Sequence, residues 1–149
     1  MPRQNWELLE QDTSANEVNM SGALSSFQPY VRSVLRIIAG LTFSLHGYQK
    51  LLGAFGGHKV EAYSLFWTAG LIESIGGTLI ILGLFTTPVA FILCGEMAVA
   101  YFKAHFPRGF LPIVNGGELA VLYCFVFLYL FTAGPGNFSL DHVLRKKPS

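Results

Sequence analysis

Four apolar stretches dominate this chain and restrict its fold more than any other feature. They lie near residues 30–52, 65–86, 87–105 and 116–134, and each approaches the roughly 20 residues that an α-helix needs to cross a hydrocarbon layer about 30 Å thick. Their length and the lack of period-two alternation exclude membrane β-strands. Only 13% of the 149 residues are charged, against about 25% in a soluble domain. The predicted fold class is an all-α membrane protein, a four-transmembrane-helix bundle with antiparallel up-down topology.

The flanking segments differ from this membrane domain, which covers residues 30–144. Residues 1–29 are polar and lack the apolar core of a cleavable signal peptide, so we expect a flexible N-terminal tail. Translation from Met20 instead of Met1 would shorten this tail, and both starts stay open. Ser139 is expected to cap a short helix that runs through Leu144 along the membrane surface. Residues 145–149 form a basic C-terminal tail.

The distribution of Lys and Arg side chains predicts the orientation. With four spans both termini share one side of the membrane. That side carries Arg3, Arg32, Arg36, Arg145, Lys146 and Lys147, and the opposite side carries Lys50, Lys59, Lys103 and Arg108. Because Lys50 and Lys103 are also candidates for a buried site, the asymmetry in the loops is larger, and both termini are predicted to be cytoplasmic. Arg36, about a turn and a half into the first span, is expected to reach the inner headgroups.

Two cysteines, Cys94 and Cys124, fall inside the third and fourth stretches, and the chain has no CxxC motif. Counted along their helices, they lie roughly 10 and 15 Å from the cytoplasmic ends. This axial offset makes a disulfide marginal, and small apolar filler is the favoured interpretation.

Ionisable side chains inside the spans carry the functional prediction. Such a group at bilayer depth costs about 2.5–3.5 kcal/mol on insertion scales, so it normally faces the helix bundle and has a partner. Glu73 and Glu96 lie roughly 12 and 13 Å from the outer ends of their helices, and His46 roughly 9 Å. Spacings of three and four place Gln49 and Lys50 on the same helix face as His46. The predicted catalytic residues are therefore Glu73, Glu96, His46 and Lys50.

Residues nearer the helix ends complete the predicted site. The predicted substrate-binding residues are Gln49, Lys103, His105, Asn115 and Glu118. Lys103 has a second explanation, since a lysine at a helix end extends to the membrane interface. Glu118 has one too, because a first-turn acid complements the positive end of a helix. No metal site is predicted.

Several motifs together resemble the DoxX family over about residues 30–144. They are His46-Gly47-Tyr48-Gln49-Lys50, Glu73 with Gly76-Gly77, the His105-to-Pro112 loop with Gly109-Phe110, Asn115-Gly116-Gly117-Glu118, Gly134-Pro135-Gly136 and Ser139-Leu140-Asp141. The resemblance implies a small bacterial inner-membrane protein with four helices. It also suggests a link to thiosulfate:quinone oxidoreductase or to oxidative and thiol stress responses. Glu96 is not part of the general family pattern.

The leading hypothesis is a quinone-linked redox membrane subunit. Lys50 or His46 would donate to the quinone oxygens, and the carboxylates of Glu73, Glu96 or Glu118 would relay protons. No haem, dinucleotide or zinc motif is present, so no intrinsic cofactor is expected and a partner redox subunit would supply electrons. A proton-coupled small-solute transporter, working as a homo-oligomer, and a non-catalytic scaffold subunit are the alternatives. Whether the chain is itself an enzyme stays open.

Aromatic side chains are frequent in the spans, and some of them are candidates to line a slot for the quinone ring. These are Phe43, Tyr48, Phe91, Tyr101 and Phe102. Plain packing is the commoner role for aromatic residues inside a helix bundle.

Overall fold

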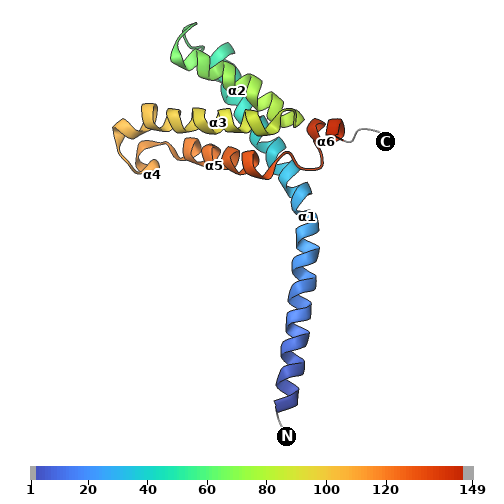
Figure 1. The fold of residues 1–149 in the computed structure, drawn as a ribbon. Coiled ribbons are helices and arrows are strands. Elements are labelled where there is room, and N and C mark those ends of the chain that lie inside the picture. The colour runs from blue at the N-terminus through green and yellow to red at the C-terminus, as the bar shows by residue number, and fades with distance from the viewer. Residues whose placement is uncertain (1–2, 146–149) are drawn as a thin grey trace.

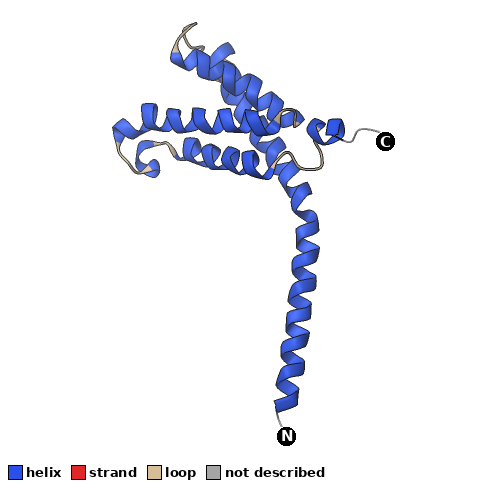
Figure 2. Cartoon of the chain, in the orientation of Figure 1, coloured by secondary structure: helices blue, strands red, loops and turns tan. Residues whose placement is uncertain are grey.

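The computed structural model describes the backbone of residues 3–145 and the side chains of residues 22–145, and every regular element in this part of the chain is a helix (Figure 2). The elements are α1 (Arg3–Leu52), α2 (Leu65–Leu82), α3 (Thr86–Ala100), α4 (Pro112–Asn115), α5 (Glu118–Ala133) and α6 (Leu140–Arg145). A π-helical segment (Tyr101–His105) and a 3-10 turn (Phe106–Arg108) extend α3. The all-α prediction is confirmed. Of the predicted basic tail, all but Arg145 lies outside the described residues.

The first predicted apolar stretch, residues 30–52, is the C-terminal part of α1, and the other three coincide closely with α2, the extended α3 and α5. Two of these segments, Leu65–Leu82 and Thr86–Arg108, are long and apolar enough to cross a membrane, with mean hydropathies of 1.7 and 1.4. The helix Glu118–Ala133 is apolar but shorter. Spans through α1 and α5 therefore stay predictions.

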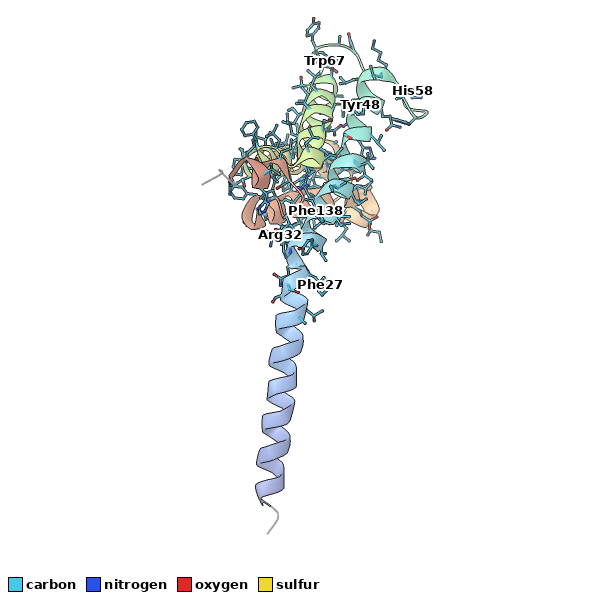
Figure 3. All side chains as sticks on the ribbon, turned by 90° about the vertical axis from the view of Figure 1, so that its right-hand side faces the viewer. Phe27, Arg32, Tyr48, His58, Trp67 and Phe138 are labelled. Carbon is cyan, nitrogen blue, oxygen red and sulfur yellow. The ribbon has the colours of Figure 1, made fainter. Side chains whose placement is uncertain are left out.

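The helices associate as two pairs. α1 packs along α2, and α3 lies beside α5, while the first pair crosses the second at a steep angle (Figures 1 and 3). Inside each pair the chain reverses between the helices, through residues 53–64 for α1 and α2 and through residues 101–117 for α3 and α5. This arrangement does not establish the predicted up-down bundle, which stays a prediction.

The N-terminal half of α1 projects away from the packed helices (Figure 1). The helix continues without a break through Pro29, and Phe27 lies on the projecting part (Figure 3). The structure has a helix over residues 3–29, where the polar composition predicts a tail. The flexibility of this segment stays a prediction.

Large apolar side chains fill the region where the two helix pairs cross. Phe43 of α1, Ile80 of α2, Leu93 of α3 and Phe127 of α5 are all at most 1% exposed. The rings of Phe43 and Phe127 meet edge to face with centroids 4.8 Å apart. One contiguous core therefore joins both pairs.

Arg36 is the largest of the fully buried side chains, with 0% of its surface exposed. Its Nε donates to the carbonyl of Pro135 at 2.9 Å, and its terminal nitrogens donate to the carbonyls of Ile80, Ile81 and Phe138. The carbonyls in the last turn of a helix have no partner within that helix, and the guanidinium supplies donors to two of them in α2. The prediction that Arg36 reaches the inner headgroups is wrong, because these carbonyls hold its charged end inside the protein.

Replacing Arg36 with Met should lower the free energy of unfolding by about 3 kcal/mol or more, because several buried carbonyls lose their donor together. Thermal unfolding of the purified protein in detergent measures this loss. Arg108→Met is the matched control, since Arg108 is exposed. Equal midpoints for the two variants would contradict the structural role of Arg36.

Asp141, which is far from α3 in the sequence, caps the N-terminus of that helix. The Asp141 carboxylate accepts hydrogen bonds from the backbone amides of Phe85 and Thr86 at 2.9 and 2.8 Å, and the Asp141 amide donates to the carbonyl of Gly83 at 2.9 Å. Phe85, the N-cap residue of α3, makes no side-chain cap of its own. Asp141 therefore provides the anion and the acceptors that a helix N-terminus favours.

The predicted cap of the last helix is also present. Ser139 precedes α6, and its Oγ accepts a hydrogen bond from the amide of His142 at 3.1 Å. Ser139 itself is buried. The placement of this helix on the membrane surface stays a prediction.

We expect Asp141→Ala to destabilise the protein at pH 7 by about 1 kcal/mol, as for other lost helix caps. Partial burial alone would raise the pKa of the Asp141 carboxyl, but the amides of Thr86 and Phe85 and the nearby Arg145 hold that pKa below its ordinary value. Since folding lowers this pKa, the stabilisation is complete above about pH 4 and is lost as the pH falls further. Thermal unfolding at pH 7 and pH 3 should show the difference from wild type shrinking, and a difference independent of pH would refute it.

Candidate functional site

Small residues bring the backbones of α1 and α2 into direct contact. A Cβ atom added at Gly40 would lie 2.8 Å from the carbonyl oxygen of Gly77, and one added at Gly47 would lie 2.7 Å from that of Gly70. Neither position accepts a side chain without a shift, so glycine is required for this packing. Gly70 and Gly77 flank Glu73 in α2, so this packing brings α1 close to Glu73.

This contact places Lys50 beside Glu73. The Lys50 Nζ forms an ion pair with Oε1 of Glu73, and the two side chains are 29% and 3% exposed. Lys50 lies in the last turn of α1, so its charge also complements the negative end of that helix. The second carboxylate oxygen of Glu73 is buried without a hydrogen-bond partner among the described residues.

A cavity of about 510 Å³ lies between α2 and α3, and this ion pair forms part of its wall. Glu96 and Lys103 line the same cavity from α3 and its π-helical extension. Both carboxylate oxygens of Glu96 are buried, and neither has a hydrogen-bond partner in the described part of the chain. The cavity therefore combines a satisfied ion pair with a carboxylate whose acceptors are free for a ligand.

The rest of the cavity wall is apolar and reaches the outer surface of the helices. Ile72 and Met97 contribute from the inside, while Phe66, Ile92 and Val99 line the cavity and are each more than half exposed. In a bilayer those exposed side chains would face acyl chains. A molecule with a polar head and an apolar body fits such a site, because the head can reach the charges while the body stays in hydrocarbon.

The other predicted residues of α1 lie near this cavity but do not line it. The ring of His46 meets that of Tyr123 edge to face, with centroids 6.2 Å apart. Gln49 packs its side chain against Gly57 in the loop after α1. Of the three residues predicted on this helix face, Lys50 lines the cavity, whereas His46 and Gln49 do not.

His105 and Asn115 belong to a loop network at the end of α3. The Asn115 side chain, 2% exposed, donates to the carbonyl of Gly109 at 2.6 Å and accepts from the amide of Gly117 at 2.8 Å. The ring of His105 lies 3.3 Å from the Asn115 carbonyl oxygen. These contacts give His105 and Asn115 a structural role in the loop, and neither residue lines the cavity.

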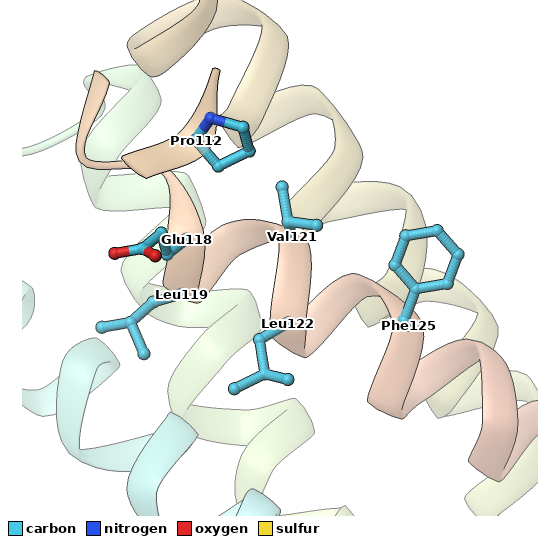
Figure 4. Close-up of a pocket in the computed structure, with 6 residues that line it drawn as sticks. All are labelled: Pro112, Glu118, Leu119, Val121, Leu122 and Phe125. Atoms are coloured by element: carbon cyan, nitrogen blue, oxygen red, sulfur yellow. The ribbon is translucent and has the colours of Figure 1, made fainter. Parts of the chain in front are cut away.

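Glu118 lies at a second, shallower hollow of about 430 Å³ on α5, together with Pro112, Leu122 and Phe125 (Figure 4). The side chain is exposed and sits in the first turn of α5. This position agrees with the alternative interpretation of Glu118 as an acid at a helix N-terminus.

The aromatic residues suggested for a ring slot do not line the cavity. Phe43 is in the core, the Tyr48 hydroxyl lies 3.3 Å from that of Thr78, and Tyr101 donates to the carbonyl of Phe110. Phe91 and Phe102 are exposed. Helical spacing predicts the cavity wall better than aromatic composition does, because several residues three or four positions from Glu73 or Glu96 share a helix face with them and line the cavity. These are Ala69, Ile92, Val99 and Ala100.

Gly47→Ala tests whether close helix packing positions the ion pair. We expect it to lower the free energy of unfolding by about 1–3 kcal/mol, because the new methyl group overpacks the contact between α1 and α2. Gly95→Ala is the control, since nothing lies within 4 Å of its added Cβ and helix propensity alone would stabilise it by about 1 kcal/mol. If thermal unfolding shows no difference between the two variants, the proposed packing is wrong.

All regular structure in the described part of the chain is helical, and two of its helices are apolar and long enough to cross a membrane. These features are typical of small helical membrane proteins. Comparison with known proteins gives the family: the DoxX sequence profile matches residues 31–106. The chain belongs to the DoxX family, as its motifs predict.

Two relatives extend this similarity beyond the family profile. A protein of Haemophilus influenzae, named as uncharacterised, is 44% identical over 131 residues, which is 83% of this chain and 98% of the relative. An uncharacterised membrane protein of Mycobacterium tuberculosis is 28% identical over 131 residues, 76% of this chain and 80% of the relative. No solved structure matches the chain.

Proposed function

We propose that the protein binds the headgroup of a membrane quinone in the cavity between α2 and α3 and acts as a quinone-linked subunit of a redox complex. The observation that carries the proposal is the unpartnered, buried carboxylate of Glu96 beside the Lys50–Glu73 pair in an otherwise apolar cavity. A quinone has two carbonyl acceptors, and the reduced quinol has two hydroxyl donors. The cavity offers lysine donors for the first and carboxylate acceptors for the second.

Proton transfer follows from the same arrangement. When a quinol is oxidised, it releases two protons and two electrons, and the Glu96 and Glu73 carboxylates are the groups in the cavity that can accept those protons. In the opposite direction the same carboxyl groups would deliver protons to a reduced quinone. A partner redox subunit supplies or removes the electrons in this proposal.

The proposed membrane placement has four spans, through residues 30–52 of α1, α2, the extended α3 and α5. Both termini then face the cytoplasm of a bacterial cell, with Arg32 near that face and the cavity in the outer half of the inner membrane. The apolar flank of the cavity faces the lipid at this depth, so the isoprenoid tail of the quinone stays in the bilayer.

Tryptophan fluorescence offers a direct binding test. The chain has two tryptophans, and Trp67 lies in α2 between the cavity residues Phe66 and Thr68, so Trp6→Phe isolates its signal. A short-chain benzoquinone titrated into this variant should quench Trp67. Glu96→Gln should weaken binding about ten-fold or more, because a hydrogen bond to a charged group contributes about 1.5–3 kcal/mol.

Glu96 suits this test because its carboxylate makes no hydrogen bond within the described chain, so the substitution removes no internal contact. Glu118→Gln is the matched control outside the cavity and should bind as the parent does. Equal affinities for Glu96→Gln and Glu118→Gln, with both variants folded, would exclude the cavity as the quinone site. Uptake by proteoliposomes that depends on Glu96 would then favour the transporter hypothesis.

A further inference from the structure

The two cysteines of the chain meet at the interface between α3 and α5. The sulfur atoms of Cys94 and Cys124 lie 3.6 Å apart, and both thiols are free. The axial offset expected from counting along the helices is therefore wrong. α3 begins at Thr86 and α5 ends at Ala133, so Cys94 and Cys124 lie eight and nine residues from these two neighbouring helix ends, at nearly the same level. A disulfide needs a sulfur separation of about 2.05 Å, so the atoms have to approach by only about 1.5 Å.

The cysteine pair contacts the protein core on one side and is exposed on the other. Both cysteines pack against the edge of the core that contains Leu93 and Phe127, and both side chains are partly exposed. The neighbouring Phe91 and Phe125 are 62% and 63% exposed. In the membrane that exposed side faces acyl chains, so molecules dissolved in the bilayer reach the sulfurs.

The cysteine pair is separate from the charged cavity. Residues 94 and 96 of one α-helix differ in direction by about 200°, so Cys94 and Glu96 project from opposite sides of α3. Glu96 lines the cavity towards α2, whereas Cys94 contacts Cys124 of α5. A molecule held in the cavity therefore does not touch the sulfurs, and their reaction partner has to come from the lipid.

We propose that Cys94 and Cys124 are a site of reversible oxidation that forms a disulfide between α3 and α5, with a hydroperoxide dissolved in the bilayer as oxidant. The sulfur of one cysteine attacks the O–O bond, which gives a sulfenic acid and releases an alcohol. The second sulfur then attacks the sulfenic sulfur, which forms the S–S bond and releases water. Two thiols are oxidised by two electrons, and the hydroperoxide is reduced to the alcohol and water.

The chain offers a clean test, because these are its two cysteines. Protein in liposomes is treated with cumene hydroperoxide, and free thiols and sulfenic acids are then blocked in SDS with N-ethylmaleimide and dimedone. Disulfides are afterwards reduced and labelled with a heavy maleimide. Wild-type monomer should gain two heavy labels. Cys94→Ser and Cys124→Ser should gain none, and thermal unfolding checks that both variants are folded.

Copper phenanthroline serves as a second oxidant that reports geometry alone. A disulfide with copper phenanthroline but none with cumene hydroperoxide would overturn the proposed oxidation, and no disulfide with either reagent would overturn the pairing as well. Reversible labelling of a single-cysteine variant, or a disulfide found only between two copies, would equally contradict an intramolecular bond. Loss of thiols that reduction does not restore would show over-oxidation and would overturn reversibility.

Discussion

The direct backbone contact between α1 and α2 is the constraint on which the charged part of this structure depends. Glycines at positions 40, 47, 70 and 77 remove the side chains that would keep the helices apart. The short distance lets Lys50 reach Glu73 across the helix pair, so a carboxylate that is 3% exposed has a cation at one oxygen. An unpaired charge in that position would cost several kcal/mol, so helix packing and the ion pair support each other. Glu73 has a partner at one oxygen, whereas neither oxygen of Glu96 has a hydrogen-bond partner among the described residues, so Glu96 is the carboxylate most open to a ligand.

The same requirement for internal partners explains the opposite end of the molecule. The last carbonyls of α2 and the first amides of α3 lie at a tight turn around Gly83. These groups have no hydrogen-bond partner within their own helices, so other parts of the protein have to supply one. Arg36 donates to the former and Asp141 accepts from the latter, so one residue of each charge completes the two helix ends. Since Arg36 also binds the carbonyls of Pro135 and Phe138, the C-terminal segment is fastened to the helices. The site region and the turn region are thus built by one rule, that buried polar groups find protein partners.

The sequence predicted the helices and the inward-facing carboxylates because hydropathy and the cost of a buried charge are local properties. Of the nine residues that it predicted for the site, the structure places Lys50, Glu73, Glu96 and Lys103 around one cavity, and the other five do not line it. It did not predict the burial of Arg36, because the position of Arg36 near a helix end was interpreted as access to the lipid headgroups. The carbonyls of Pro135 and Phe138, to which Arg36 donates, lie about a hundred residues further along the chain. The cysteine pair was missed because axial counting depends on helix ends, which a hydropathy pattern places only to within a residue or two. The observed ends, Thr86 of α3 and Ala133 of α5, bring the two cysteines to nearly the same level.

Helix α3 joins these features because its two sides have different chemistry. The side towards α2 carries Glu96, an apolar cavity wall and Leu93, and the side towards α5 carries Cys94. A bond between Cys94 and Cys124 would fix α3 against α5 without occupying the cavity. Leu93 packs into the space left by Gly76, so the position of α3 relative to α2 depends on the same turn of helix. Any restraint on α3 from the α5 side is therefore transmitted to the cavity wall through a packed contact, not through the charged residues themselves.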